Sequence, residues 1–236
     1  SLLSVAGEHT SMEGDREQAK RRAGESAARQ VEDGTVVGLG TGSTAAAAIR
    51  HLGERVDSGL DIRGIPTSNQ SRSLAREVDI PLTTLAAATP DIAIDGADQV
   101  AGRTLIKGGG AAHAREKVVD AAATRFLVVV DQTKVADSLD HPVPVAVFPD
   151  ARATVSTAVA ELGGEATLRQ ASRKDGPVVT DNGNLVLDCA FGVIDGPADL
   201  AVALDTVPGV VAHGLFVGLA DEIHVGGIDG VEVRTD

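Results

Sequence analysis

The segment TVVGLGTGSTAAAAIRHLGERV, residues 35–56, decides the fold class of this chain. Its apolar start, 35–40, is typical of a short buried strand, and the alanine-rich run behind it predicts a helix with Ser43 or Thr44 at the N-cap. Three glycines alternate through the turn that joins them: Gly38, Gly40 and Gly42. Such a turn presents backbone N–H groups at the positive end of a helix dipole, which favours phosphate. A plain serine-capped turn without a ligand is the alternative.

Apolar runs and helical runs alternate along the first part of the chain. The expected strands are 35–40, 61–68, 91–98 and 125–131, and the expected helices are 15–31, 43–56, 69–78 and 110–122. Strands that alternate with helices form a parallel, doubly wound sheet with right-handed crossovers. This part of the sequence therefore predicts an α/β domain.

The rhythm changes near residue 141. The run HPVPVAVF (141–148) carries two prolines and is typical of the start of a new domain or of an edge strand. A helix is expected at 151–163, and Asn182-Gly183 between two β-rich runs predicts a hairpin. A helix at 197–206 and a strand at 209–216 complete a small α+β unit, and two short strands close the chain.

The composition favours a buried parallel sheet and excludes some partners. Of the 236 residues, 43% are hydrophobic, with four Phe and neither Trp nor Tyr, so the core is built from Val, Leu, Ile and Ala. The net charge of −13 argues against nucleic acid or an anionic membrane as the main partner. Only five of the 21 basic residues are lysine. We interpret this balance as adaptation to high salt, with an ordinary acidic protein as the alternative. Unfolding at low salt would support the first.

The remaining global features indicate a cytoplasmic protein. Cys189 is the only cysteine, so no disulfide can form within the chain and a reducing compartment is expected. No apolar run has the length of a transmembrane helix, and residues 1–14 lack the pattern of a signal peptide. We expect those residues to form a disordered leader.

Three loops follow predicted strands, at the sheet edge where open α/β folds bind ligands. In the first, the hydroxyls of Thr41, Ser43 and Thr44 add donors to the glycine turn. This turn is neither a Walker loop nor a dinucleotide fingerprint, because Ser43 stands where the latter needs glycine. In the second, Asp95 and Asp98 can converge on one ligand. A solvated turn and a metal site are the alternatives there, although no His or third acid lies nearby in sequence.

The third loop lies in LIKGGGAAHAREKVV, residues 105–119. Lys107 stands at the end of a further expected strand and precedes Gly108–Gly110, and Glu116 lies on the helix that follows. The alternative for this helix is an ordinary exposed charged face, and His113 is interpreted as a surface residue. Lys134, after the next strand, is expected to add a cation to the same edge, with an ordinary surface lysine as the alternative. Together the three loops predict a sugar phosphate site with proton-transfer chemistry that needs no cofactor.

Five segments in order resemble the type A ribose-5-phosphate isomerases, over about residues 20–234. They are GLGTGSTAAAAI, IDGADQV, LIKGGGAAHAREKVV, FLVVVDQTKV and VVTDNGNLVLD. The resemblance implies a Rossmann-like catalytic domain (15–140 plus 214–236) interrupted by a smaller ferredoxin-like α+β domain (141–213). It also implies interconversion of D-ribose 5-phosphate and D-ribulose 5-phosphate through a cis-enediolate, in the non-oxidative pentose phosphate pathway. Neither metal nor other cofactor is implied, and a homodimer or homotetramer is expected. The acidic, lysine-poor composition adds a halophilic archaeon as the expected source.

The resemblance also assigns residues. Substrate binding falls to Thr41, Gly42, Ser43, Thr44, Asp95, Gly96, Ala97, Asp98, Lys107, Gly108, Gly109, Gly110 and Lys134, with Lys20 on a weaker match. Glu116 is the proton acceptor, and Lys107 with the glycine N–H groups holds the enediolate oxygen. Asp95 or Asp98 handles hydroxyl protons and ring opening, in a division that sequence leaves open. Gln99 and His113-Ala114 depart from the family pattern and put only peripheral contacts in doubt.

Three other functions fit this class of fold less well. A sugar-phosphate-sensing regulator needs a DNA-binding module, and only about 30 residues precede the first strand. An amino-sugar phosphate deaminase and a CoA transferase are disfavoured by the run from Lys107 to Lys117.

Overall fold

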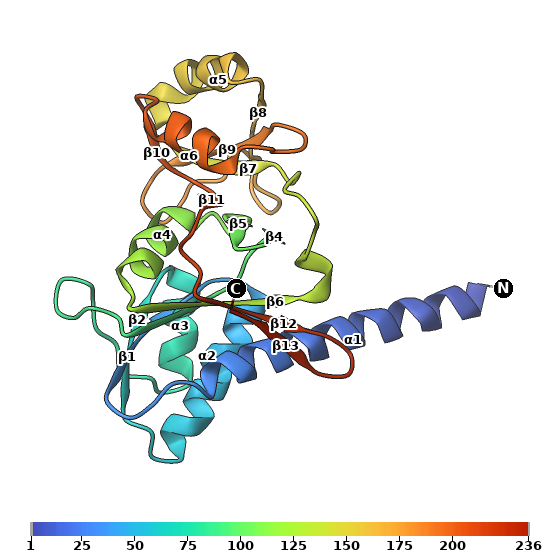
Figure 1. Ribbon diagram of the computed structural model, residues 1–236, viewed down its shortest axis with the longest axis vertical. Helices are drawn as coiled ribbons and strands as arrows, with labels where there is room; N and C mark the ends of the chain where they lie inside the picture. The colour runs from blue at the N-terminus through green and yellow to red at the C-terminus, as the bar shows by residue number, and fades with distance from the viewer. Residues whose placement is uncertain (1, 236) are drawn as a thin grey trace.

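The computed structural model describes residues 2–235, with side chains from residue 13. Its centre is a six-stranded sheet in the order β13-β12-β6-β3-β1-β2 (Figure 1). The strands are β1 (Thr35–Leu39), β2 (Ile62–Pro66), β3 (Ile92–Asp95), β6 (Arg125–Asp131), β12 (Glu222–Gly226) and β13 (Val231–Arg234). All neighbours pair in parallel except β12 and β13. The predicted α/β class with a mainly parallel sheet is confirmed.

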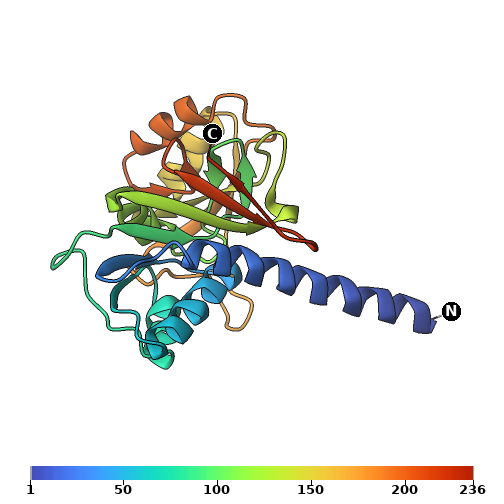
Figure 2. The same cartoon turned by 60° about the horizontal axis from the view of Figure 1, so that its bottom comes forward.

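Helices cover both faces of this sheet (Figure 2). The helices are α1 (Leu2–Ala28), α2 (Ser43–Asp57), α3 (Asn69–Glu77) and α4 (His113–Ala122). The first three lie on one face, where alanines of α1 and α2 pack with Leu39 and Leu127 of the sheet. On the other face lies α4, whose Val119 packs with Val36 of β1 and Ile65 of β2.

The first helix is longer than the sequence indicates. Residues 2–14, expected to be a disordered leader, continue the helix predicted for 15–31 toward the N-terminus, and this helix ends at Ala28. The extension projects away from the body of the protein (Figure 1). A helix that is already nucleated by packing gains one hydrogen bond for each residue added, so extension costs little. Residue 1 lies outside the described residues.

A second, antiparallel sheet has the order β10-β7-β9-β8. Its strands are β7 (Val143–Val147), β8 (Glu165–Leu168), β9 (Leu185–Ala190) and β10 (Val210–His213), and it carries α5 (Arg152–Glu161) and α6 (Pro197–Asp205). This sheet has an apolar cluster of its own, which includes Val145, Leu187 and Leu204. We propose that it forms the smaller domain, with boundaries near 141 and 213.

Two expectations for this region need correction. The strand β7 is not at an edge, because it pairs with β10 on one side and β9 on the other. Its Pro144 is tolerated because the backbone there faces the end of β10, where its carbonyl accepts a hydrogen bond from Gly214 N at 2.7 Å. Asn182-Gly183 does form a turn, but only Val179 and Leu185 bridge across it, so the first arm is not a full strand.

A three-stranded antiparallel sheet, β11-β5-β4, joins the two larger sheets. It consists of β4 (Gln99–Ala101), β5 (Thr104–Ile106) and β11 (Leu215–Phe216). Neither β4 nor β8 is predicted from sequence, since both are too short for a clear alternation. The small sheet matters for function because Asp98 precedes β4 and Lys107 follows β5. Within residues 2–235, the structure contains no helix that could span a membrane.

Candidate active site

A cavity of about 200 Å³ opens where β1, β3 and β6 end. The structure brings most of the predicted site residues to its wall: Thr41, Gly42, Ser43, Thr44, Gly96, Ala97, Asp98, Lys107, Gly108, Gly109, Gly110, Glu116, Lys134 and Lys20. Asp95 does not reach the wall, since it is fully buried beneath Lys107. This is the sheet edge at which an open α/β fold binds its ligand.

Three further residues line the cavity that the sequence did not single out: Arg16, Gln70 and Asp131. Arg16 lies four residues before Lys20 on α1, so both face the same side of that helix. Asp131 is the last residue of β6, and the strand-end rule that found Asp95 could have found it. Gln70 gives no sequence signal.

One end of the cavity is built for an anion by the start of α2. The N-cap is Gly42 rather than Ser43 or Thr44, and no side chain caps the helix. Gly42 has φ 103°, a left-handed conformation that glycine adopts without strain. The first amides of α2 are therefore free for a ligand, and the dipole favours a negative one.

Positive side chains surround the same end. Lys20 and Arg16 reach it from α1, and Lys134 reaches it from the short helix after β6, Gln132–Lys134. Arg16 Nε lies 3.3 Å from Asp131 Oδ2. The Thr41 hydroxyl bonds to Ser68 Oγ at 2.7 Å and lies 2.9 Å from Thr67 Oγ1, so it holds the turn in place.

The other end of the cavity is centred on Lys107, which is only 2% exposed. Its Nζ lies 3.0 Å from Asp95 Oδ2 and 3.3 Å from Glu116 Oε2, and it donates to the Gly96 carbonyl. Burial alone would lower the pKa of Lys107, but Asp95 and Glu116 outweigh burial and raise it above its usual value. Lys107 is thus a fixed positive charge.

Asp95 is held from below by the turn after β1. Its Oδ1 accepts hydrogen bonds from Thr41 N at 2.9 Å and Gly96 N at 2.7 Å. Burial raises the pKa of Asp95, and the Lys107 ammonium opposes this shift. A Cβ on Gly40 would stand 2.2 Å from Asp95 Oδ1, so only glycine leaves room for this carboxylate.

We expect Gly40→Ala to lower the free energy of unfolding by about 1–3 kcal/mol, the usual cost of overpacking a buried site. Urea unfolding of the variant measures this loss. Gly230→Ala is the matched control, because its new Cβ meets nothing within 4 Å and its stability should change by less than about 0.5 kcal/mol. Equal stability of the two variants would show that Gly40 is not a packing constraint.

Glu116 lies on the buried face of α4. His113, Glu116 and Asp120 share that face, at helical spacings of three and four. Burial, and then the charge of Asp95, raise the pKa of Glu116 to about 8. The alternative of an ordinary exposed face is therefore wrong for Glu116, which is 4% exposed.

Two neighbours of Glu116 on this face are also buried. His113, interpreted from sequence as a surface residue, is fully buried, because the helix face that buries Glu116 also buries the residue one turn before it. Its Nε2 accepts a hydrogen bond from Ala146 N at 3.1 Å, and burial lowers the pKa of His113 to about 3, so the ring is neutral. His113 does not line the cavity. Asp120 is 2% exposed and its oxygens lack hydrogen-bond partners among the described residues. Burial raises the pKa of Asp120 well above its usual value.

The glycine loop completes this end. Gly108 has φ 109°, and Gly109 N donates to Asp98 Oδ2 at 2.7 Å. Asp98 thus lines the cavity and holds the loop, whereas Asp95 holds Lys107. Among the described residues, no group of three or more His, Cys, Asp or Glu side chains is arranged to hold a metal ion.

Comparisons of the sequence with known proteins indicate the family of this chain. The sequence model of ribose 5-phosphate isomerase A (phosphoriboisomerase A) matches residues 63–230. The ribose-5-phosphate isomerase A of Natronomonas pharaonis is 73% identical, over 94% of this chain and 98% of the relative, and that of Haloarcula marismortui is 68% identical, over 94% and 98%. Both organisms are halophilic archaea, which supports the high-salt interpretation of the acidic composition.

Comparison with solved structures gives the same family. Ribose 5-phosphate isomerase A from Methanocaldococcus jannaschii has a TM-score of 0.91 at 44% identity, covering 94% of this chain and all of the other. A D-ribose-5-phosphate isomerase in complex with phospho-erythronic acid also has a TM-score of 0.91, at 42% identity, covering 93% and 99%. The fold and the sequence motifs lead to one assignment: this chain belongs to the ribose 5-phosphate isomerase A family.

Proposed function

We propose that this chain interconverts D-ribose 5-phosphate and D-ribulose 5-phosphate in its cavity. The observation that carries the proposal is a buried Glu116 beside a buried Lys107 at one end and an uncapped helix start with cations at the other. The first pair suits proton transfer at carbon, and the second suits a phosphate.

The phosphate binds at the start of α2, in this proposal. The amides of Ser43 and Thr44 donate to its oxygens, and the Ser43 hydroxyl, which is exposed, adds another donor. Lys20 and Lys134 balance its charge. Binding energy from this remote group helps to orient the reacting carbons.

Glu116 carries out both proton transfers. Its carboxylate removes the proton from C2 of the open-chain aldose, which forms a cis-enediolate, and the resulting acid returns a proton to C1 to give the ketose. One group suffices because the proton leaves C2 and returns to C1 on the same face of the planar intermediate. A pKa near the working pH is favourable for a group that must both accept and donate.

Lys107 and the loop amides stabilise the enediolate oxygens. Asp98, on the cavity wall, is placed to exchange hydroxyl protons and to assist ring opening, while Asp95 keeps Lys107 in position. This divides the two roles that sequence leaves open. The chemistry requires no metal or other cofactor.

Activity should rise with pH through an apparent pKa near 8. Only the ionised form of Glu116 accepts the C2 proton, and burial raises the pKa of this group to about 8. Each pH unit below that value lowers the carboxylate fraction about tenfold. The pH dependence of kcat/KM tests this, and a limb at the ordinary glutamate value, about 4.5, would contradict it.

The direct test is an isomerase assay with ribose 5-phosphate over a range of salt concentrations. Absence of activity at every concentration overturns the proposed function. We also propose a homodimer or homotetramer that acts in the cytoplasm. The molar mass measured by light scattering tests the assembly. An enzyme that is active as a monomer would contradict it.

A further inference from the structure

We infer that Arg169, directly after β8, and Asp188, on β9 of the four-stranded antiparallel sheet, orient the glycine loop so that the Gly110 N–H faces the reacting oxygens. This inference rests on the proposed function. Arg169 does not line the cavity, so it is a positioning residue that acts through the loop.

Arg169 binds the loop through two carbonyls. Its Nη1 donates to Gly108 O at 2.8 Å and to Gly109 O at 3.0 Å. The rest of the guanidinium is held by Asp188, through Nε to Oδ2 at 2.9 Å and through Nη2 to Oδ1. A guanidinium group that is bound by a carboxylate in this way has little freedom to move with the loop.

The geometry of a trans peptide fixes the direction in which each N–H group of the loop points. The structure has no cis peptide bonds among its described residues, so the N–H of each peptide points away from its carbonyl. In the peptide between Gly108 and Gly109, the carbonyl meets Arg169 and the N–H meets Asp98 Oδ2 on the opposite side. This peptide is held from both sides.

The next peptide is held from one side only. The Gly109 carbonyl meets Arg169, so the Gly110 N–H points the other way, away from the guanidinium. Gly110 lines the cavity, and its N–H has no hydrogen-bond partner in the described part of the chain. The Gly110 N–H is thus an unused donor directed into the cavity, where the substrate would lie.

The Gly108 carbonyl also accepts a turn hydrogen bond from Ala111 N at 2.9 Å, whereas Arg169 is the one partner of the Gly109 carbonyl among the described residues, so the second peptide depends on this clamp. Glycine reaches nearly all backbone conformations, and a rotated peptide would turn a carbonyl, rather than an N–H, toward the enediolate. Donors stabilise a developing oxyanion only when they are already oriented before the reaction. The clamp comes from a distant sheet: Arg169 follows β8, and Asp188 lies on β9.

The test compares Arg169→Ala, Arg169→Lys and Asp188→Asn with the wild type. Losing one oxyanion donor lowers kcat by about 10²–10³-fold, so we expect Arg169→Ala to lose at least tenfold in kcat with KM nearly unchanged. Lysine keeps the charge but cannot hold two carbonyls and a carboxylate at once, so it should not restore kcat. Asp188→Asn should lose less, since Arg169 remains. The pH profile should keep its midpoint.

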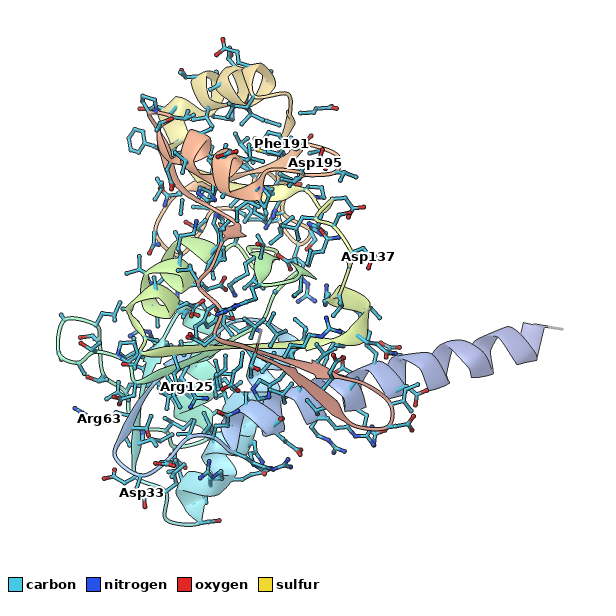
Figure 3. All side chains as sticks on the ribbon, in the orientation of Figure 1. Asp33, Arg63, Arg125, Asp137, Phe191 and Asp195 are labelled. Atoms are coloured by element: carbon cyan, nitrogen blue, oxygen red, sulfur yellow. The ribbon has the colours of Figure 1, made fainter. Side chains whose placement is uncertain are left out.

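The control is Arg125→Lys. Arg125, labelled in Figure 3, starts β6 at the opposite end from the cavity and pairs with Glu222. Changing it tests the loss of a half-buried arginine pair without touching the loop, and kcat should stay within twofold.

A second readout separates this inference from the proposed function. Phospho-erythronic acid, the compound bound in the related structure, has a carboxylate where the substrate would have its enediolate oxygens. Its affinity should fall at least tenfold in Arg169→Ala and Arg169→Lys, while inorganic phosphate binds as to the wild type. Unchanged affinity, or a lower melting temperature with unchanged kcat, overturns the positioning role. An inactive wild type that still shows this affinity loss overturns only the proposed function.

Discussion

Glu116→Gln is expected to lower kcat by about 10²–10⁴-fold, the usual contribution of a general base. The amide has nearly the same shape as the carboxylate, so it keeps the packing of α4 against Lys107, yet it cannot accept the C2 proton. Steady-state kinetics with ribose 5-phosphate measures the loss. Glu161→Gln, at the exposed end of α5, is the matched control and should be fully active.

Glu116→Gln should also change how the free energy of unfolding depends on pH. Burial raises the pKa of Glu116 from 4.5 to about 8 in the folded state, so the folded protein binds more protons than the unfolded chain between these values. The contribution of this group to stability therefore falls as pH rises through that window. Glu116→Gln removes the penalty, and urea unfolding should show it gaining on the wild type as pH increases. Full activity, or a constant stability difference, would mean that Glu116 is not the buried base.

The sequence predicts this fold well where its signals are local. The central strand β6 is buried on both sides, and a strand of that kind is a nearly continuous apolar run, here 125–131. Glycine and acidic residues then interrupt the runs at the cavity edge, which is why Asp95, Lys107 and the α2 turn are visible in the sequence. The sequence does not indicate the position of β7, because a proline is typical of an edge strand. Pro144 fits in a central strand only because it lies beside the end of β10.

The missed parts of the site depend on contacts between distant residues. Arg169 reaches the glycine loop from about 60 residues away, and nothing in its own neighbourhood distinguishes it from a surface arginine. The partner of His113 is also distant in sequence, since its Nε2 accepts a hydrogen bond from Ala146 N on β7, and no helical pattern indicates that contact. Propensity and spacing describe one element at a time, so they locate residues at element ends and miss those that join two sheets.

Lys107→Met should have the largest combined effect on activity and stability. Removing this donor leaves the enediolate oxygens without their buried cation, and we expect kcat to fall by about 10²–10³-fold. It also leaves Asp95 and Glu116 without a counter-charge, which costs about 3–5 kcal/mol when one partner of a buried pair is removed. Lys174→Met, at an exposed turn, is the control and should change neither quantity.

A second variant separates the two effects of Lys107. In Lys107→Met alone, the carboxyls must stay protonated to remain buried, so the destabilisation should be smallest at acidic pH and grow as pH rises. Adding Asp95→Asn removes one uncompensated carboxylate and should restore much of the free energy of unfolding. It cannot restore kcat, because the cation that faces the enediolate is still absent. If the double variant regained activity, Lys107 would serve only to neutralise Asp95, and the oxyanion would depend on the loop amides alone.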